Sequence, residues 1–392
     1  MTNILHIAPT PFFSDRGCHV RIEGIVNSLA ALGFENTVCT YHHGRDVDGI
    51  RTRRISTIKN YTQTAAGPSK YKLWADWKLL WTAFKQYRQQ PPAVIHAHLH
   101  EGLMIGLCLK LLFFWKRTPL IADIQGSLSG ELESHGVFKK WAFLKWPTLQ
   151  LEKLLLLCAN HVVCSSAHSL SQIVDDFGMS KNRISLAQDG ANSTVKPSEK
   201  SIIQSKAELN IPLDKAVVVY SGALLDAKGL DELKQVIASC KHISNVHFLI
   251  IGYPVDDLNT FLNTHQLNKI CTLTGQLDFA DLHQHLYLGD IAIDPKCSNA
   301  GEGSGKMLNY LACGLPVVAF DSQNNRDFLP KGSVLSTSIS SMVEQINTLI
   351  DDEDQRKSCA KSNLAQFKKH YSWNVTKQQL SAVYSQFIAI PQ

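Results

Sequence analysis

The amino-acid sequence predicts an α/β protein built from two doubly wound, Rossmann-like domains. Short apolar runs alternate with helical patterns along nearly the whole chain, and the alternation restarts after a polar segment near the middle. Strands that alternate with helices form parallel sheets that helices cover on both faces. A length of 392 residues gives each of two such domains enough sequence for a core of its own.

The predicted strands are short apolar segments, and apolar residues at helical spacing separate them. In the first half the strands cover residues 4–8, 37–41, 94–97, 120–123, 161–164 and 184–187, with helices at 20–32 and 146–158. In the second half they cover residues 216–221, 246–252, 271–273, 290–294 and 316–320, followed by helices at 340–351, 353–371 and about 375–388.

Residues 189–200 have the composition of a linker, with Gly190, Asn192, Pro197 and Ser198 among them. We therefore assign residues 1–190 to the first domain and residues 199–371 to the second. Ligands of doubly wound sheets bind at the carboxyl ends of the strands. With two such domains facing each other, we expect the active site in the cleft between them.

Composition argues against several classes of protein. A formal charge of +5 spread over the chain is not the clustered basic footprint of a nucleic-acid-binding protein. The ten cysteines are scattered without a C-x-x-C pair, which favours buried free thiols in a reducing compartment over disulfides or a metal site. The N-terminal residues do not resemble a signal peptide, and the longest apolar stretch, 102–115, contains Lys110 and is too short to span a bilayer. A cytoplasmic protein is expected.

The segment 299–318 predicts an anion-binding loop. A glycine-rich run follows a buried strand, and a helix then begins near Ser304 or Gly305. Glycine lets the backbone approach a ligand, and the free N–H groups of a helix start attract anions. Lys306 in the first turn opposes the helix dipole, and a bound diphosphate would remove that conflict. From these residues alone, an ordinary βα loop with a solvated lysine fits equally well.

Residues 311–318, Leu-Ala-Cys-Gly-Leu-Pro-Val-Val, resemble the donor-binding motif of glycosyltransferase family 4, the retaining GT-B enzymes also called glycosyl transferases group 1. The resemblance implies the GT-B fold and a nucleoside-diphosphate sugar as donor, with no metal or other cofactor. It implies that Glu302 contacts the donor sugar. Asn309 stands where the family's second glutamate contacts the ribose, so the choice of nucleotide stays open.

Further segments resemble the same family in the same order. Residues 220–229, Tyr-Ser-Gly-Ala-Leu-Leu-Asp-Ala-Lys-Gly, resemble its phosphate clamp, with Lys228 in place and Ala223 where an arginine is usual. We expect Lys306 to supply the missing charge. Residues 273–277 resemble the loop that reads the base. The implied donor-binding residues are Gly17, Ser221, Gly222, Lys228, Gly275, Gln276, Glu302, Gly303, Ser304, Gly305, Lys306 and Asn309.

In the first domain, Gly17 matches one of the family's two adjacent glycines after the first strand. His98 ends the third predicted strand and Gln125 follows the fourth, which places both on the acceptor side. The alternation of His96, His98 and His100 is compatible with a metal site, but the strand is expected to end near His98, and the family needs no metal. For His96 and His100, polar loop residues remain an equally good interpretation. The family's closing helix, matched by residues 373–390, packs back onto the first domain.

The resemblance predicts that the enzyme accelerates transfer by stabilising the negative charge of the leaving group. Gln125 stands where many members have histidine and is not a base, so the donor's own phosphate is expected to take the acceptor proton while the protein stabilises the leaving group. The residues predicted to contribute most are Glu302, Lys228 and His98.

Aromatic and basic residues recur together in the first domain. Trp74, Trp77, Trp81 and Phe84 repeat at helical spacing among lysines and arginines, and residues 138–146 form a second such patch. This pattern suits an anionic membrane surface. The alternative is that the tryptophans are the core face of their helix.

The sequence therefore predicts a retaining glycosyltransferase of the hexosyltransferase type. The acceptor is expected to be a hydroxyl of a glycan or a lipid-linked molecule in surface polysaccharide or glycolipid synthesis, and the enzyme is expected in the cytoplasm, peripheral to the inner face of the membrane. Two alternatives remain open: a nucleotide-sugar epimerase of the same fold, and a non-catalytic protein that binds sugar nucleotides.

Overall fold

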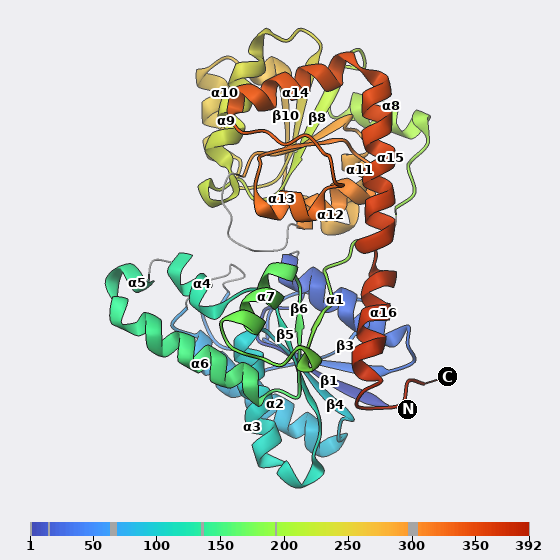
Figure 1. Ribbon diagram of the computed structural model, residues 1–392. Helices are drawn as coiled ribbons and strands as arrows, with labels where there is room; N and C mark the ends of the chain where they lie inside the picture. The colour runs from blue at the N-terminus through green and yellow to red at the C-terminus, as the bar shows by residue number, and fades with distance from the viewer. Residues whose placement is uncertain are drawn as a thin grey trace. The chain divides into compact units, whose positions relative to one another are not determined.

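The computed structural model describes residues 2–14, 16–62, 69–134, 137–192, 194–296 and 305–391. These residues form two compact units (Figure 1). Unit 1 holds the residues up to 190 together with those from 373 onward, and unit 2 holds those from 191 to 372. Each unit is a parallel sheet with helices on its faces, which confirms the predicted fold class.

The sheet of unit 1 has seven parallel strands in the order β3-β2-β1-β4-β5-β6-β7. Their bounds are β1 (Asn3–Ala8), β2 (Glu35–Thr40), β3 (Arg51–Arg54), β4 (Val94–His98), β5 (Leu120–Ile124), β6 (His161–Cys164) and β7 (Ile184–Leu186). The six predicted strands are all present. Strand β3 was not predicted because its sequence, Arg-Thr-Arg-Arg, is polar; it lies at the sheet edge, where charged side chains discourage pairing with another chain.

Alternate residues of the central strands face opposite layers of helices, as the period of a strand requires. Ile4 of β1 packs with Ile25 of α1 and Leu380 of α16, whereas Leu5 packs toward Leu79 of α2. The helices are α1 (Gly17–Ala30), α2 (Lys72–Gln89), α3 (Leu99–Leu112), α4 (Leu128–Ser134), α5 (Val137–Lys140), α6 (Lys145–Cys158), α7 (Ala167–Asp175) and α16 (Trp373–Tyr384).

The C-terminal helix α16 is part of unit 1. The indole of Trp373 lies directly against Gly24 of α1, where any side chain would overlap it. Thr376 Oγ1 donates to the Gln188 carbonyl at 2.9 Å, and Tyr384 Oη lies 2.7 Å from His96 Nδ1 on β4. Because these contacts tie both ends of α16 to the sheet and to α1, the closing segment completes the core of unit 1.

The sheet of unit 2 has five parallel strands in the order β10-β9-β8-β11-β12. They are β8 (Ala216–Ser221), β9 (Val246–Ile251), β10 (Cys271–Gly275), β11 (Ile291–Asp294) and β12 (Val317–Ala319). All five were predicted. The helices are α8 (Glu199–Glu208), α9 (Leu230–Ser239), α10 (Asp256–Thr264), α11 (Leu282–Leu286), α12 (Gly305–Ala312), α13 (Gln323–Phe328), α14 (Ile339–Asp351) and α15 (Glu353–His370).

Each strand order has one point where the chain changes direction across the sheet. In unit 1 this point lies between β1 and β4, and in unit 2 it lies between β8 and β11. Doubly wound sheets bind ligands at these points, beside the carboxyl ends of the strands. Within the residues that the structure covers, no helix has both the length and the apolar character of a membrane-spanning segment.

The packing of Trp373 of α16 on Gly24 of α1 predicts that a methyl group added at Gly24 lowers the stability of unit 1. Gly24→Ala should lower the free energy of unfolding by about 1–3 kcal/mol, because the methyl group overlaps the indole of Trp373. The exchange would otherwise favour the helix. Thermal unfolding followed by tryptophan fluorescence measures the change.

The control is Gly130→Ala in α4, where the added Cβ meets only ordinary contacts with Ser127. Combining Gly24→Ala with Trp373→Leu should restore part of the lost stability. A Gly24→Ala variant as stable as the wild type would contradict the packing of α16.

Candidate functional site

In unit 2, Tyr310 of α12 joins the two strands at the switch point. The Ser221 N–H, at the end of β8, donates to Tyr310 Oη at 2.7 Å. Tyr310 Oη in turn donates to the Ile293 carbonyl of β11 at 3.3 Å. The buried phenol holds α12 against both strands, and Lys306 in the first turn of α12 pairs with Asp294, so the helix begins beside the carboxyl end of β11. This is the position expected of a helix that binds an anion.

Lys228 lies in the turn that follows β8, and Gly229 fixes where that turn packs. Gly229 has a φ of +89°, which favours glycine. A Cβ at this position would lie 2.9 Å from the Lys296 nitrogen and 3.0 Å from the Pro295 carbonyl carbon. The Lys228–Gly229 turn is therefore packed directly on the backbone that follows β11, where the predicted donor loop begins.

Lys306 is ion-paired inside unit 2. Its Nζ lies 2.7 Å from Oδ1 of Asp294, a buried carboxylate at the end of β11, and 4.7 Å from the centre of the Tyr220 ring. The Lys306 side chain is 13% exposed, so the interpretation as a solvated lysine is wrong. Its charge is already balanced by Asp294, which weakens it as a replacement for the missing arginine at Ala223.

Asn309 is buried on α12, and both ends of its amide have partners. Its Oδ1 lies 2.8 Å from Nε2 of His283, and its Nδ2 donates to the Gly305 carbonyl at 2.8 Å. Burial lowers the pKa of His283, against the opposing effect of the bond to Asn309, so the ring is neutral with its proton on Nε2. A second N–H of Nδ2 and a second lone pair of Oδ1 are the groups that Asn309 has left for a ribose hydroxyl.

The remaining predicted donor residues fall at the same edge or outside the described residues. Gly275, with a φ of +72°, ends β10, and Gln276 beside it is exposed. Gly222, with a φ of +144°, follows β8, and Gly305 is exposed at the start of α12. Glu302, Gly303 and Ser304 lie outside the residues that the structure describes.

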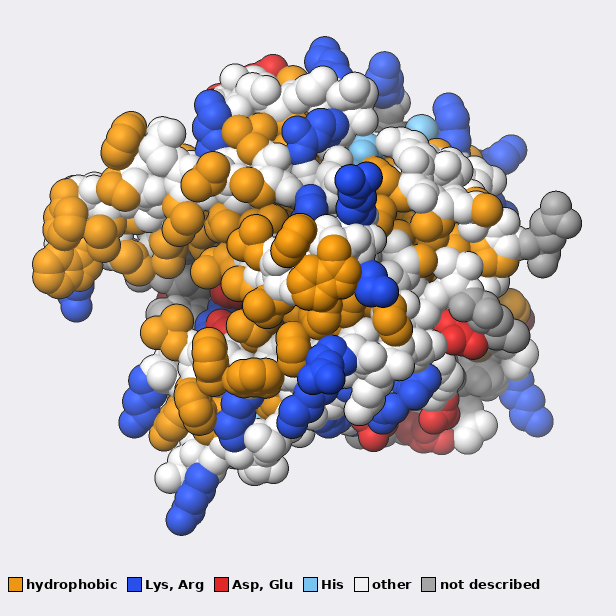
Figure 2. Space-filling view, turned by 90° about the horizontal axis from the view of Figure 1, so that it is seen from below, with side chains coloured by type: hydrophobic (Ala, Val, Ile, Leu, Met, Phe, Trp, Pro, Cys, Tyr) orange, Lys and Arg blue, Asp and Glu red, His pale blue; other side chains and the backbone are white. Residues whose placement is uncertain are grey.

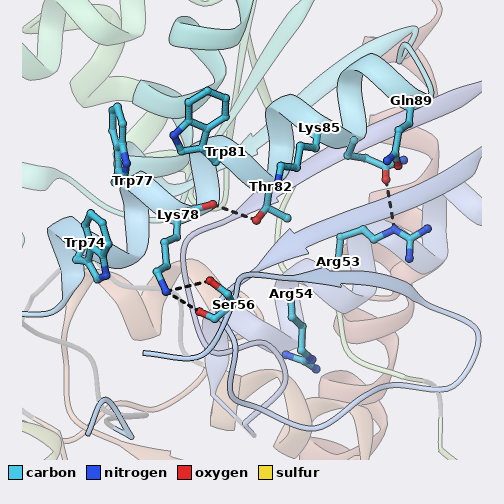
Figure 3. A pocket seen from close by; sticks show the side chains of 11 residues that line it. Arg53, Arg54, Ser56, Trp74, Trp77, Lys78, Trp81, Thr82, Lys85 and Gln89 are labelled. Carbon is cyan, nitrogen blue, oxygen red and sulfur yellow. Dashed lines mark hydrogen bonds between the residues drawn. The ribbon is translucent and has the colours of Figure 1, made fainter. Parts of the chain in front are cut away.

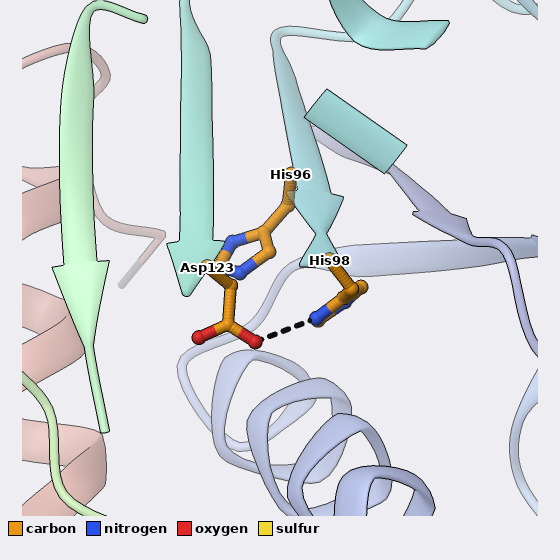
Figure 4. Close-up of side chains that lie close together, drawn as sticks. All are labelled: His96, His98 and Asp123. Carbon is orange, nitrogen blue, oxygen red and sulfur yellow. Dashed lines mark hydrogen bonds and ion pairs between the residues drawn. The ribbon is translucent and has the colours of Figure 1, made fainter. Parts of the chain in front are cut away.

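In unit 1, a network of buried charges lies at the switch point. One oxygen of Asp123, at the end of β5, lies 2.9 Å from His98 Nδ1 (Figure 4). The other oxygen accepts from Arg21 of α1 (Nε, 2.9 Å, and Nη2, 2.5 Å). Arg21 also bonds Asp189 at 2.5 Å. Burial alone would raise the pKa of Asp123, but the charge of Arg21 and the bond from His98 lower it below its ordinary value.

Hydrogen bonds connect His98 to Asn36 through the ring of His6. Asn36 turns its Oδ1 toward His6, because its Nδ2 donates to the Phe34 carbonyl at 3.1 Å. His6 Nε2 therefore donates to Asn36 at 3.0 Å. Burial and the neighbouring His98 lower the pKa of His6 to about 3, so His6 is neutral and its Nδ1 accepts from His98 Nε2 at 3.1 Å. His98 therefore joins His6 to Asp123 through its two ring nitrogens.

This arrangement changes the roles open to the histidines. His98 is fully buried, so the predicted contact with an acceptor has no exposed ring atom to make it. His96, His98 and Asp123 approach one another closely enough to suggest a cation site, but both ring nitrogens of His98 already have hydrogen-bond partners. His100 leaves the strand register, as predicted, and pairs with Glu152 at 3.2 Å. The interpretation of His96 and His100 as loop residues is wrong, because both are buried, His96 in β4 and His100 in α3.

Two other predicted residues lie at the same edge of the unit 1 sheet. Gln125 follows β5 and its Nε2 lies 3.4 Å from Asp123 Oδ2. Gly17 begins α1, and a Cβ there would meet nothing within 4 Å. The space beside Gly17 is therefore open, as a backbone approach to a ligand requires.

Sequence reasoning missed the residues that hold these sites in place. They are Arg21, Asp189, Tyr310, Asp294 and His283. One signal was available: Arg21 stands between Val20 and Ile22 in an apolar helical pattern, and an arginine on a core face needs a buried carboxylate.

Two family models match the chain. Residues 201–365 match glycosyl transferases group 1, and residues 16–188 match the glycosyl transferase 4-like domain. D-inositol 3-phosphate glycosyltransferase 1 of Catenulispora acidiphila is 23% identical over 252 residues. That match spans 59% of this chain and 59% of the relative, less than two thirds of its length.

Solved structures share the fold over nearly the whole chain. Sucrose-phosphate synthase from Thermosynechococcus elongatus has a TM-score of 0.78 at 18% identity, covering 98% of this chain and 99% of that one. Anabaena HepE in complex with UDP and glucose has a TM-score of 0.77 at 17% identity, covering 98% and 100%.

The neutral state of His6 predicts how the stability of unit 1 depends on pH. Its pKa is about 3 in the folded protein and 6.5 as the ordinary value, so its contribution is complete above pH 6.5 and is lost as the pH falls toward 3. Between about pH 7.5 and about pH 5, His6 should remove about 2 kcal/mol from the free energy of unfolding. His6→Gln should show a pH dependence smaller by that amount.

Denaturant titrations followed by tryptophan fluorescence measure this in unit 1, which contains all seven tryptophans. His168→Gln, an exposed histidine of α7, is the control and should keep the wild-type dependence. Equal pH dependence of His6→Gln and the wild type would show that His6 is not held neutral.

Proposed function

The chain belongs to the glycosyl transferases group 1, the GT-B glycosyltransferases of family 4, and from that premise we propose that it is a retaining enzyme whose donor is a nucleoside-diphosphate sugar. The observation that supports this most strongly is the edge of unit 2 between β8 and β11. There the Lys228–Gly229 turn packs on the backbone after β11, and α12 begins beside the same strands.

The diphosphate of the donor would bind at this edge. Lys228 supplies charge, and the free N–H groups at the start of α12 supply hydrogen bonds. Lys306 is a secondary contributor, because a diphosphate has to share it with Asp294. We propose Glu302 for the donor sugar and Asn309 for the ribose. Structures of Anabaena HepE with UDP and with UDP-glucose support a nucleotide sugar as the donor class.

In the proposed reaction the bond between the anomeric carbon and the leaving phosphate oxygen breaks, and the acceptor oxygen bonds to the same face of the sugar. The acceptor proton passes to the leaving phosphate oxygen, so no protein base is needed. The enzyme's contribution is to stabilise the negative charge that builds on the diphosphate. Lys228 and the start of α12 suit that task.

On the acceptor side, we propose a positioning role for His98. Its ring bonds Asp123, and Asp123 in turn lies beside Gln125 in the loop after β5. Gln125 is then the residue of this group that reaches an acceptor hydroxyl, and Gly17 leaves space for the donor phosphate.

We propose a glycan or lipid-linked acceptor, with the enzyme attached to the cytoplasmic face of a membrane through unit 1. The prediction that tryptophans form the core face of α2 is wrong: Ala75, Leu79 and Ala83 are buried, whereas Trp74 and Trp77 are 53% and 50% exposed. Exposed aromatic side chains beside lysines suit the interface of an anionic bilayer.

The proposed donor site predicts unequal effects for its two lysines. Lys228→Ala should lower kcat/KM at least about a hundredfold, because the developing charge on the diphosphate loses a main partner. Lys306→Met should cost about tenfold or less, since Asp294 already neutralises Lys306. Release of nucleoside diphosphate, measured over a panel of sugar nucleotides, gives both values.

Lys241→Ala, an exposed lysine of the same unit, is the control and should keep full activity. Full turnover by Lys228→Ala would rule out its role in the donor site. Binding of nucleotide by the wild type with no release from any donor would favour a non-catalytic binding protein.

A further inference from the structure

A groove of about 490 Å³ lies between the edge strand β3 and helix α2 of unit 1 (Figure 3). Arg53 and Arg54 come from β3, and Trp74, Trp77 and Trp81 come from successive turns of α2. The other lining residues are Ser56, Lys78, Thr82, Lys85, Gln86 and Gln89. The groove is separate from the switch point of the sheet, because β3 is the outermost strand and the switch lies between β1 and β4.

The groove has excess positive charge. Four of the described lining residues are basic and none is acidic. Arg54 is paired with Asp46, but in the part of the chain that the structure describes no carboxylate pairs with Arg53, Lys78 or Lys85. Arg53 Nε donates only to the neutral amide of Gln86, at 3.3 Å. The charges of these three cations favour an anionic ligand in the groove.

Lys78 is held in position for such a ligand. Its Nζ donates to Ser56 Oγ at 2.9 Å and to the carbonyls of Ser56 and Thr57 at 3.2 Å. These partners are neutral, so they orient the ammonium group without cancelling its charge. The Lys78 Nζ also lies 5.8 Å from the centre of the Trp74 ring, which fixes the indole beside it.

The rim of the groove continues into a ridge of aromatic side chains. Trp77 contacts Trp81, Trp81 contacts Phe84, and Phe84 stacks on Phe113, with ring centres 6.3, 5.4 and 5.2 Å apart. From Phe113 the contacts pass to Trp115 at 5.8 Å. The α2 residues and the turn at Phe114–Lys116 thus form one surface.

That surface is apolar and open. Leu73, Leu111 and Phe114 are 85%, 74% and 71% exposed. Figure 2 shows hydrophobic side chains gathered over one face of the molecule, with lysines and arginines among them. An open apolar surface of this extent marks a binding surface, and its mixture with basic residues matches the boundary between headgroups and acyl chains.

We propose that the groove between β3 and α2 binds the phosphate headgroup of an anionic membrane lipid. The phosphate oxygens lie between Arg53, Lys78 and Lys85, and the acyl chains leave along the indoles toward the aromatic ridge. A water-soluble phosphate compound would use the cations but leave the ridge exposed to water, which is why we assign the site to a lipid. This proposal rests on the membrane attachment proposed above and gives it a specific contact.

The test compares vesicles of phosphatidylcholine with and without phosphatidylglycerol in a flotation assay, at fixed ionic strength. The double variant Arg53→Gln/Lys85→Gln should lose at least about tenfold in affinity for the anionic vesicles, because each basic residue at an anionic surface contributes about 1 kcal/mol. Both side chains are exposed, so folding should be unaffected, and thermal unfolding checks this.

The matched control is Lys241→Gln/Lys269→Gln, two exposed lysines of unit 2 whose loss changes the net charge equally. It should change affinity less than about twofold. Inorganic phosphate, added at the same ionic strength as chloride, should fail to displace the wild type. Quenching of tryptophan fluorescence by brominated phosphatidylglycerol should be strong in the wild type and reduced in the groove variant.

Equal losses in the two double variants would overturn the groove site, since net charge would then explain binding. Displacement by inorganic phosphate would also overturn it, by showing a site for a soluble anion. If the wild type does not float with anionic vesicles, the proposed membrane attachment is overturned as well. These outcomes leave the transferase proposal unchanged, because that proposal is tested separately by nucleoside diphosphate release from the wild type and Lys228→Ala.

Discussion

The buried carboxylate of Asp123 is the interaction on which unit 1 depends. Through Arg21 it ties α1 to the sheet, through His98 and His6 it links β5 to β4 and β1, and Asp189 completes the charge balance. Charged groups this close together in a core are tolerated only if they stay paired, because removing one partner leaves an uncompensated buried charge. The network therefore fixes the ends of β4 and β5 and the start of the loops that follow them.

Unit 2 also has its strand ends fixed by polar groups, but fewer of these groups are charged. A phenol, Tyr310, joins β8 to β11 through α12, and Gly229 brings the Lys228 turn onto the backbone after β11. The pair of Lys306 and Asp294 is the one buried ion pair at this edge among the residues that the structure covers. Both units thus place rigid polar groups at the switch points of their sheets, where a parallel sheet leaves strand ends free for a ligand.

Much of this could be predicted from the sequence, because the period of apolar residues is a local property. Eleven strands and the start of α12 followed from it, while β3 did not, since an edge strand of arginines has no apolar face. The network around Asp123 joins residues that lie far apart in the sequence, from position 6 to position 189, so no local pattern of residues predicts their contacts. The direct role predicted for His98 has no support for the same reason: its burial comes from tertiary packing. The side of α2 that faces the sheet could also be identified only from the structure.

The measurement that tests the account most directly is the anomeric configuration of the transferred sugar, determined by NMR on the product formed from a nucleoside-diphosphate sugar and a lipid or glycan acceptor. We predict release of the nucleoside diphosphate together with a glycoside that keeps the configuration of the donor. Retention requires the leaving phosphate and the incoming hydroxyl to lie on one face of the sugar. A glycoside of inverted configuration, or an epimerised donor with no transfer, would contradict it.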